Sequence, residues 1–368
     1  MTPGQGQMMA RRGISRRGFL ARTAAASAVL LPMPAVAEPR NIKFTLAWPA
    51  QGSSVYAFVA RARTMKPRGM DLEIARGFGS MASAQGIATG QFEFGIVAAP
   101  SLILSVAKDL PLTALATCDY DSTMGVGVLD DSPILKPQDL AGKKVASVPT
   151  SGEFPFFPAY ADRVGLAPSS IEFVHVDNKV LDRVLMEKRV DAITSFALGS
   201  ASAMLSKGVP SRWMLYSAAG IRNHGQTIAT QRKTLEADPA LCEAITDGLL
   251  EALAFTLTNP QDSLELFHRE VPEMALNPSS KEFARIGLGM WQHGIDRLEA
   301  HEHGLGWSDP AAYAETTDLV MRYLTEPGAK RPDPEAIFTN RFTGKIKLGA
   351  SDWTNVRTRV SEFDKYLS

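Results

Sequence analysis

The stretch DLEIARGFGSMASAQGIATGQFEFGI, residues 71–96, decides the fold class. Residues 71–75 alternate polar and apolar side chains and predict a strand, which ends in the glycine-rich turn 77–80. Residues 81–90 predict a helix, with Ser80 expected to cap it, and residues 92–97 predict another strand. A strand, a helix and a strand in this order indicate a parallel pair joined by a crossover helix.

The same alternation continues on both sides of this stretch. Strands are predicted at residues 42–48, 71–75, 92–97, 124–129, 143–148, 171–176 and 190–193, with helices at 55–64, 81–90, 101–107, 159–164 and 179–187. Longer helices are predicted at 235–258, 281–300 and 310–324, and no clear element from 338 onward. The rhythm restarts after the third helix, which predicts two α/β lobes rather than one continuous sheet.

The first 37 residues have a different character. They contain five arginines and no acidic residue, then a short apolar run, and then Ala-Val-Ala at 35–37. That order predicts a secretory signal peptide, and SRRGFL at 15–20 resembles the twin-arginine export motif. No cysteine follows the apolar run, so we expect a soluble periplasmic protein without a lipid anchor.

Charge and composition exclude several classes of protein. The whole chain of 368 residues has 39 basic and 39 acidic residues. Removing the five leader arginines leaves 34 basic residues and a net charge of −5, which argues against nucleic-acid binding and disfavours a strongly anionic ligand. The only cysteines, Cys118 and Cys242, form no CxxC motif, and the sequence leaves open whether they pair.

Motifs for chemistry are weak or absent. Residues 77–82 fit G-x-G-x-x-A, but the acidic residue that a dinucleotide site needs about 20 residues later is missing. His293, His301 and His303 lack the spacing of a metal motif, so we expect a solvated loop there and no metal or other cofactor. No residue pair combines a nucleophile with a base, which favours binding over catalysis.

Aromatic and hydroxyl side chains follow several predicted strands. In an open α/β sheet, ligands bind beyond the carboxyl ends of the strands. Trp48 closes the first strand, a serine- and phenylalanine-rich loop at 150–157 follows another, and Ser195 and Phe196 follow a third. This mixture suits a small planar ligand that stacks on rings and accepts hydrogen bonds from hydroxyls. His224 is a candidate at the edge of such a pocket.

Taken together, four segments resemble the periplasmic solute-binding proteins of ABC importers, in the group that binds nitrate, sulfonate, taurine and thiamine-pyrimidine precursors. They are residues 71–96, 130–148, 157–177 and 187–196. The resemblance implies a type II periplasmic binding protein fold, in which each lobe has a mixed, mostly parallel sheet and the ligand lies between lobes. It implies lobe 1 at 40–128, lobe 2 at 129–221, and a return to lobe 1 with a C-terminal helical region at 222–368.

The resemblance also implies a function and a set of contacts. We expect a monomer that closes its lobes on a small ligand and delivers it to an inner-membrane permease. A pyrimidine-like heteroaromatic is the preferred ligand, and a sulfonate, nitrate or aromatic acid is the alternative. A pyrimidine-synthesis enzyme on the same fold and a sensory module remain open. The expected ligand contacts are Trp48, Gly79, Ser80, Ala99, Ser101, Ser151, Gly152, Glu153, Phe154, Phe156, Ser195, Phe196 and His224.

Overall fold

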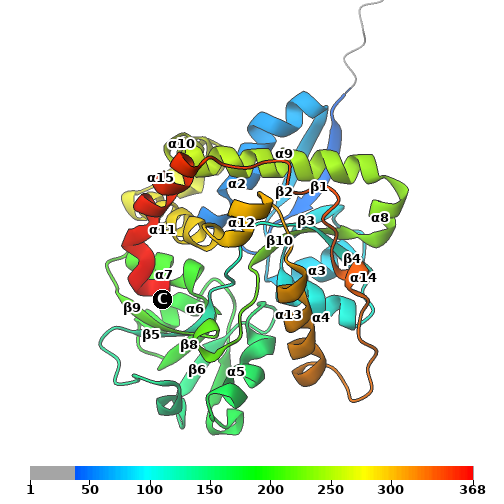
Figure 1. The fold of residues 1–368 in the computed structure, drawn as a ribbon. Coiled ribbons are helices and arrows are strands. Elements are labelled where there is room, and N and C mark those ends of the chain that lie inside the picture. The colour runs from blue at the N-terminus through cyan, green and yellow to red at the C-terminus, as the bar shows by residue number, and fades with distance from the viewer. Residues whose placement is uncertain (1–37, 368) are drawn as a thin grey trace, which may run out of the picture. The chain divides into compact units, whose positions relative to one another are not determined.

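The structure is a computed structural model that describes residues 38–367. The expected signal peptide, residues 1–37, lies outside the described residues. The compact unit that begins at Pro39 contains two five-stranded sheets, which occupy the upper right and the lower left of Figure 1.

The first sheet has the strand order β2–β1–β3–β10–β4, in which only β10 runs antiparallel to its neighbours. Every residue of β3 and β4 is buried, as expected for strands with helices on both faces. The strands are β1 (Arg40–Thr45), β2 (Met70–Ala75), β3 (Phe94–Ala98), β4 (Leu112–Thr117) and β10 (Gln226–Gln231).

The second sheet repeats this pattern in the order β7–β6–β8–β5–β9, and β5 is its antiparallel strand. Its strands are β5 (Met124–Leu129), β6 (Lys144–Ser147), β7 (Glu172–His175), β8 (Ala192–Phe196) and β9 (Ser211–Leu215). The predicted fold class, two lobes with mixed and mostly parallel sheets, is therefore confirmed.

The chain passes between the sheets through two crossing segments, residues 118–123 after β4 and residues 216–225 after β9. The first lobe was expected to extend to residue 128, whereas β5 pairs with β8 and β9 of the second sheet. The sequence MGVGVL of β5 is buried throughout. A short apolar run of this kind does not indicate which of the two sheets the strand belongs to.

Helices surround both sheets. Those of the α/β series are α2 (Val55–Val59), α3 (Ser80–Ala88), α4 (Ala99–Ala107), α5 (Phe157–Arg163), α6 (Leu181–Met186) and α7 (Ala197–Leu205). Those of the C-terminal region are α8 (Arg232–Ala237), α9 (Pro239–Thr258), α10 (Pro260–Glu270), α11 (Pro278–Ile295), α12 (Leu298–His303), α13 (Pro310–Tyr323), α14 (Pro334–Ile337), α15 (Ala350–Val360) and α16 (Asp364–Leu367).

Three strands were missing from the sequence prediction: β4, β9 and β10. In β10, Thr227 and Thr230 are fully buried, and their hydroxyls donate to the backbone oxygens of Val97 in β3 and of Glu93 just before it. Polar residues at buried positions hide the apolar pattern by which a strand is recognised. The predicted helix at 55–64 also differs, because it continues from α2 into a π-helical segment, Ala60–Met65.

The C-terminal region contacts both sheets. Helix α11 packs against α7 of the second lobe, and α16 packs against α7 and β9, as the red C-terminal segment of Figure 1 shows. In the larger core cluster the ring of Trp291 stacks on that of Tyr56, with centroids 5.0 Å apart. Cys118 and Cys242 are both buried and unpaired in the structure. Within residues 38–367, no helix combines the length and hydropathy that crossing a bilayer demands.

Candidate ligand-binding site

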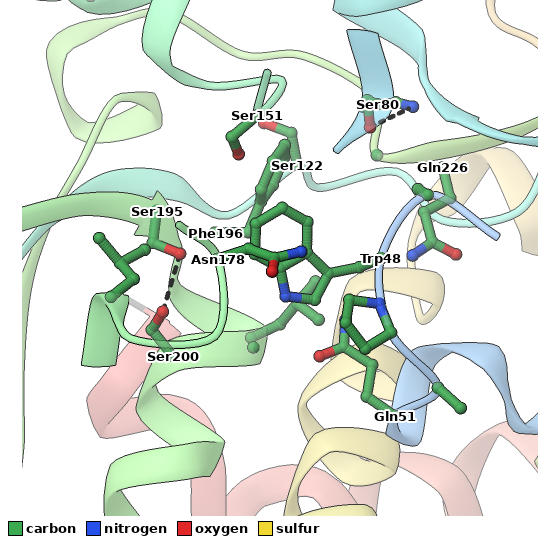
Figure 2. Close-up of a pocket in the computed structure, with 18 of the residues that line it drawn as sticks. Trp48, Gln51, Ser80, Ser122, Ser151, Asn178, Ser195, Phe196, Ser200 and Gln226 are labelled. Atoms are coloured by element: carbon green, nitrogen blue, oxygen red, sulfur yellow. Dashed lines mark hydrogen bonds between the residues drawn. The ribbon is translucent and has the colours of Figure 1, made fainter. Parts of the chain in front are cut away.

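A cavity lies where the two lobes meet, between the strand ends of both sheets (Figure 2). Its walls come from the turns after β1, β4 and β7, from β8, and from α6, α7 and α11. Its lining residues are Ala47, Trp48, Pro49, Ala50, Gln51, Ser80, Ala98, Asp119, Ser122, Ser151, Asn178, Leu181, Asp182, Ser195, Phe196, Leu198, Gly199, Ser200, Gly225, Gln226, Met274 and Phe283.

The aromatic part of the lining comes from three elements. Trp48 stands in the turn after β1, Phe196 ends β8, and Phe283 belongs to α11. All three are only half-buried, and the rings of Trp48 and Phe196 project toward the middle of the cavity in Figure 2. Half-buried rings at a cavity wall leave their faces available for stacking on a planar ligand.

Three of the predicted serines line the cavity. The Ser80 Oγ accepts a hydrogen bond from the backbone N–H of Ala98 at 3.1 Å, so it links α3 to the end of β3. It does not cap α3, because Gly79 occupies the N-cap position. The Ser195 Oγ accepts from the Ser200 Oγ at 2.8 Å, and the Ser151 hydroxyl donates to the carboxylate of Glu153.

The most informative polar groups are buried atoms without a hydrogen-bond partner among the described residues. They are the Asp119 Oδ2, the Asp182 Oδ1, the Gln226 Oε1, and both Oδ1 and Nδ2 of Asn178. Burial raises the pKa of Asp119 to about 7 and that of Asp182 to about 6. A buried polar atom without a partner costs about 1–3 kcal/mol, so the four oxygens favour a ligand that donates to them, and the Asn178 Nδ2 favours one that accepts from it.

The charge of the lining is also distinctive. Among the described residues it contains the two carboxyl groups of Asp119 and Asp182 but no lysine, arginine or histidine. An anionic ligand would therefore meet no basic side chain in this cavity. The lining offers rings, hydroxyls and acceptors, and it contains no histidine or lysine that would serve as a general base.

The two lobes touch beside the cavity through Thr150, in the loop after β6. Its backbone oxygen accepts from the N–H of Met81 at 3.2 Å, and its hydroxyl donates to the backbone oxygen of Phe78 at 2.7 Å. Gly79 lies between these contacts with φ +116°, and a Cβ there would lie 2.1 Å from the Thr150 oxygen. The position therefore requires glycine, and these two hydrogen bonds join the lobes directly.

Several expected contacts lie outside the lining. Glu153 is fully buried, and its carboxylate accepts from Ser151 and, at 3.3 Å, from the Thr194 Oγ1. Phe154 packs edge-on against Phe173 instead, and Phe156 is fully buried in a core cluster. The other expected residues that do not line this cavity are Gly79, Ala99, Ser101, Gly152 and His224, the last of which lines a different cavity.

The histidines near the C-terminal region also differ from the expected solvated loop. His301 and His303 belong to the end of α12. The His301 Nε2 lies 2.7 Å from the Asp296 Oδ1, and its ring stacks on Trp353. His303 stacks on Trp307, with ring centroids 4.7 Å apart. These rings are held by packing against tryptophans.

Sequence reasoning missed the side chains with unpartnered atoms. Asp119 follows β4, a strand that the sequence prediction lacked, and Asn178 lies three residues after β7 in a loop without an aromatic or hydroxyl side chain to draw attention to it. Asp182 and Ser200 lie within α6 and α7, and Phe283 lies within α11. Only the packing of helices from distant parts of the chain brings these residues to the cavity.

Comparison with known proteins agrees with this architecture. The riboflavin-binding protein RibY of Chloroflexus aurantiacus is 22% identical over 262 residues, which cover 69% of this chain and 71% of that protein. The structure of the periplasmic aliphatic sulphonate-binding protein SsuA from Escherichia coli matches with a TM-score of 0.60 and 17% identity, covering 83% of this chain and 99% of that one.

A second solved structure gives the same picture. The alkanesulfonate-binding protein SsuA from Xanthomonas axonopodis pv. citri, bound to MOPS, matches with a TM-score of 0.60 and 14% identity over 82% of this chain and all of that one. These relatives are named as binding proteins, in agreement with the expectation of a binding protein rather than an enzyme. The family model described as NMT1/THI5 like matches residues 65–263, more than half of the chain. The chain therefore belongs to the NMT1/THI5-like family.

Proposed function

We propose that this protein is the solute-binding component of an ABC-type importer, and that its ligand is a small heteroaromatic compound bearing N–H donors. The observation that carries the ligand class is the lining of the cavity, where half-buried rings surround unpartnered acceptors and no basic side chain is present. The name of the RibY relative, a riboflavin-binding protein, supports a ring-containing ligand.

Each part of the lining has a role in this proposal. Trp48 and Phe196 stack on the faces of the ring. The Asp119 Oδ2, Asp182 Oδ1 and Gln226 Oε1 accept hydrogen bonds from ring or exocyclic N–H groups, and Asn178 both donates and accepts. Ser80, Ser151 and Ser195 complete the polar wall. A pyrimidine-like or flavin-like ring presents donors and acceptors around one plane, which this arrangement matches.

Binding in this proposal works by lobe closure. The two crossing segments, 118–123 and 216–225, form the hinge, and the contacts of Thr150 with Phe78 and Met81 hold the lobes together once ligand bridges them. The closed form then presents its ligand to a membrane permease. We place the mature chain in the periplasm as a monomer, after export of the leader by the twin-arginine route.

A thermal-shift screen of the purified mature protein tests the proposed ligand class. The screen compares riboflavin and aminopyrimidines with taurine, other alkanesulfonates and nitrate at equal concentrations. Because a ligand that binds only the folded state raises the melting temperature, we expect the heteroaromatic set to stabilise the protein and the anions to leave it unchanged. Stabilisation by sulfonates or nitrate alone would contradict the proposed heteroaromatic ligand and favour an anionic one.

A further inference from the structure

A second cavity, of about 500 Å³, lies beside the crossing segment 216–225. It shares no lining residue with the ligand cavity, and its walls come from both crossing segments, from α12 and from the start of α13. A cavity of this size holds several water molecules or a hydrated ion. Its chemistry is set by one histidine and by an excess of carboxylates.

His224 is the central group of this cavity. Only 4% of its surface is exposed, and neither ring nitrogen has a hydrogen-bond partner among the described residues. The ring is held edge-on between those of Tyr120 and Tyr313, with centroids 5.4 and 5.5 Å away. In a neutral imidazole one of these nitrogens has a free lone pair that can bind a metal ion.

Two carboxylates face this ring. One ligand atom from each of His224, Glu299 and Asp309 lies within 4.8 Å of the other two. Asp309 is fixed by the helix it caps, because its two oxygens accept from the N–H groups of Ala311 and Ala312 at 3.1 and 3.2 Å. Glu299 and Asp309 are half-buried, which leaves a path from solvent to the three groups.

The remaining charges of the cavity favour a cation. Asp121 and Glu315 add two further carboxylates, against the guanidinium groups of Arg222 and Arg297. Arg297 already pairs with Asp121 at 3.5 Å, so its charge is compensated within the cavity. The lining therefore carries four carboxylates against two guanidinium groups.

We propose that His224, Glu299 and Asp309 bind a divalent transition-metal ion such as Zn²⁺ or Co²⁺. One imidazole nitrogen and two carboxylates form a three-residue ligand set of the kind that leaves a position open for water. The nitrogen donor distinguishes the site from the all-oxygen sites that Ca²⁺ and Mg²⁺ prefer. Bound there, the ion would tie the crossing segment 216–225 to α12 and α13 of the C-terminal region.

Titration of the purified, untagged protein with Zn²⁺ and with Co²⁺ tests this site. We expect one Zn²⁺ per chain by calorimetry, visible absorption bands from the Co²⁺ form, and much weaker binding of Mg²⁺ and Ca²⁺. Glu299→Gln and Asp309→Asn remove one ligand charge each, and asparagine preserves the helix cap. Each variant is expected to bind Zn²⁺ at least about tenfold more weakly and to lose the Co²⁺ bands.

Glu315→Gln is the matched control, because Glu315 lines the same cavity outside the three-residue cluster. It is expected to bind Zn²⁺ as the wild type does. Circular dichroism of every variant shows that its fold is retained, so weaker binding is not a folding defect. Absence of stoichiometric binding at about 100 μM Zn²⁺, or equal weakening by Glu299→Gln and Glu315→Gln, would overturn the proposal.

Discussion

Asp119 in the first crossing segment accepts a hydrogen bond from the indole Nε1 of Trp291 in α11, at 2.9 Å. The same carboxylate oxygen accepts from the backbone N–H of Gln226 at 2.8 Å. The other oxygen lies against Gly225, where a Cβ would be only 1.7 Å away. One buried carboxyl thus connects the first crossing segment, the end of the second and the C-terminal helices.

This position of Asp119 predicts a pH dependence of stability. Burial raises its pKa from the ordinary 3.8 to about 7 in the folded protein, so the folded state holds the proton more tightly than the unfolded state does. The resulting stabilisation is complete below about pH 4 and is lost as the pH rises through about 7. A pKa shift of this size contributes on the order of 4 kcal/mol at most to the free energy of unfolding.

The variant Asp119→Asn isolates this contribution, because it cannot ionise. We measure the free energy of unfolding of both proteins in urea at pH 5 and pH 8. The wild type should lose more stability than the variant between these two pH values. Asp182 and Glu153, whose pKa values burial also raises, are present in both proteins and cancel in the difference. Identical pH dependence of the two proteins would contradict an ionisable buried Asp119.

Gly79 predicts a specific effect on lobe closure. Alanine there is strained at φ +116°, and its Cβ would collide with the Thr150 oxygen of the other lobe. We expect Gly79→Ala to weaken ligand affinity at least about tenfold, because the closed state loses at least about 1.4 kcal/mol.

Gly69→Ala is the control for Gly79→Ala. Gly69 also has a positive φ, +67°, but a methyl group at this position would have no atom beyond its chain neighbours within 4 Å. The control therefore carries backbone strain of about 1 kcal/mol without blocking closure. Equal losses of affinity in the two variants would show that strain in the first lobe, rather than closure, governs binding.

Substitutions of Glu153 distinguish a structural role of this residue from a contact with the ligand. Its carboxylate binds Ser151 and Thr194 inside the second lobe. Glu153→Gln keeps the volume and the acceptor, so ligand affinity is expected to change by less than about 1 kcal/mol. Glu153→Ala leaves a buried void and two hydroxyls without their acceptor, and unfolding should become about 2–4 kcal/mol easier. A large loss of affinity in Glu153→Gln would return Glu153 to the ligand site.

Much of the fold could be predicted from the sequence, because each strand and helix of its βαβ units has a hydrophobic pattern within a short stretch of residues. The stretch 71–96 contains most of β2, all of α3 and most of β3, and the hydrophobic periodicity of each element can be recognised from neighbouring residues alone. The crossing between lobes was placed too late because β5 pairs with β8 and β9, and antiparallel pairing with distant strands leaves no local trace. The tail was unreadable for a similar reason, since α15 packs on α9 and α11, far away in sequence.

Of the residues expected to contact ligand, those that stand at strand ends, such as Trp48 and Phe196, line the cavity. Phe154 and Phe156 lie outside the lining, because rings in a loop after a strand can turn either to a cavity or to the core, and here they pack inward. His224 turned to a second cavity for the same reason. The side-chain oxygens of Asp182 and Gln226 reach the cavity only through the packing of helices and crossing segments. No local sequence pattern indicates this packing.

The central claim, a ring-binding cavity without a basic side chain, is tested most directly by calorimetric titration of the mature protein. A heteroaromatic ligand such as riboflavin is expected to bind one to one. Trp48→Ala should weaken the binding of this ligand at least about tenfold. Trp307→Ala should not weaken it, because Trp307 lies outside the cavity lining. Binding of an alkanesulfonate in place of every heteroaromatic tested, or full affinity in Trp48→Ala, would contradict the account.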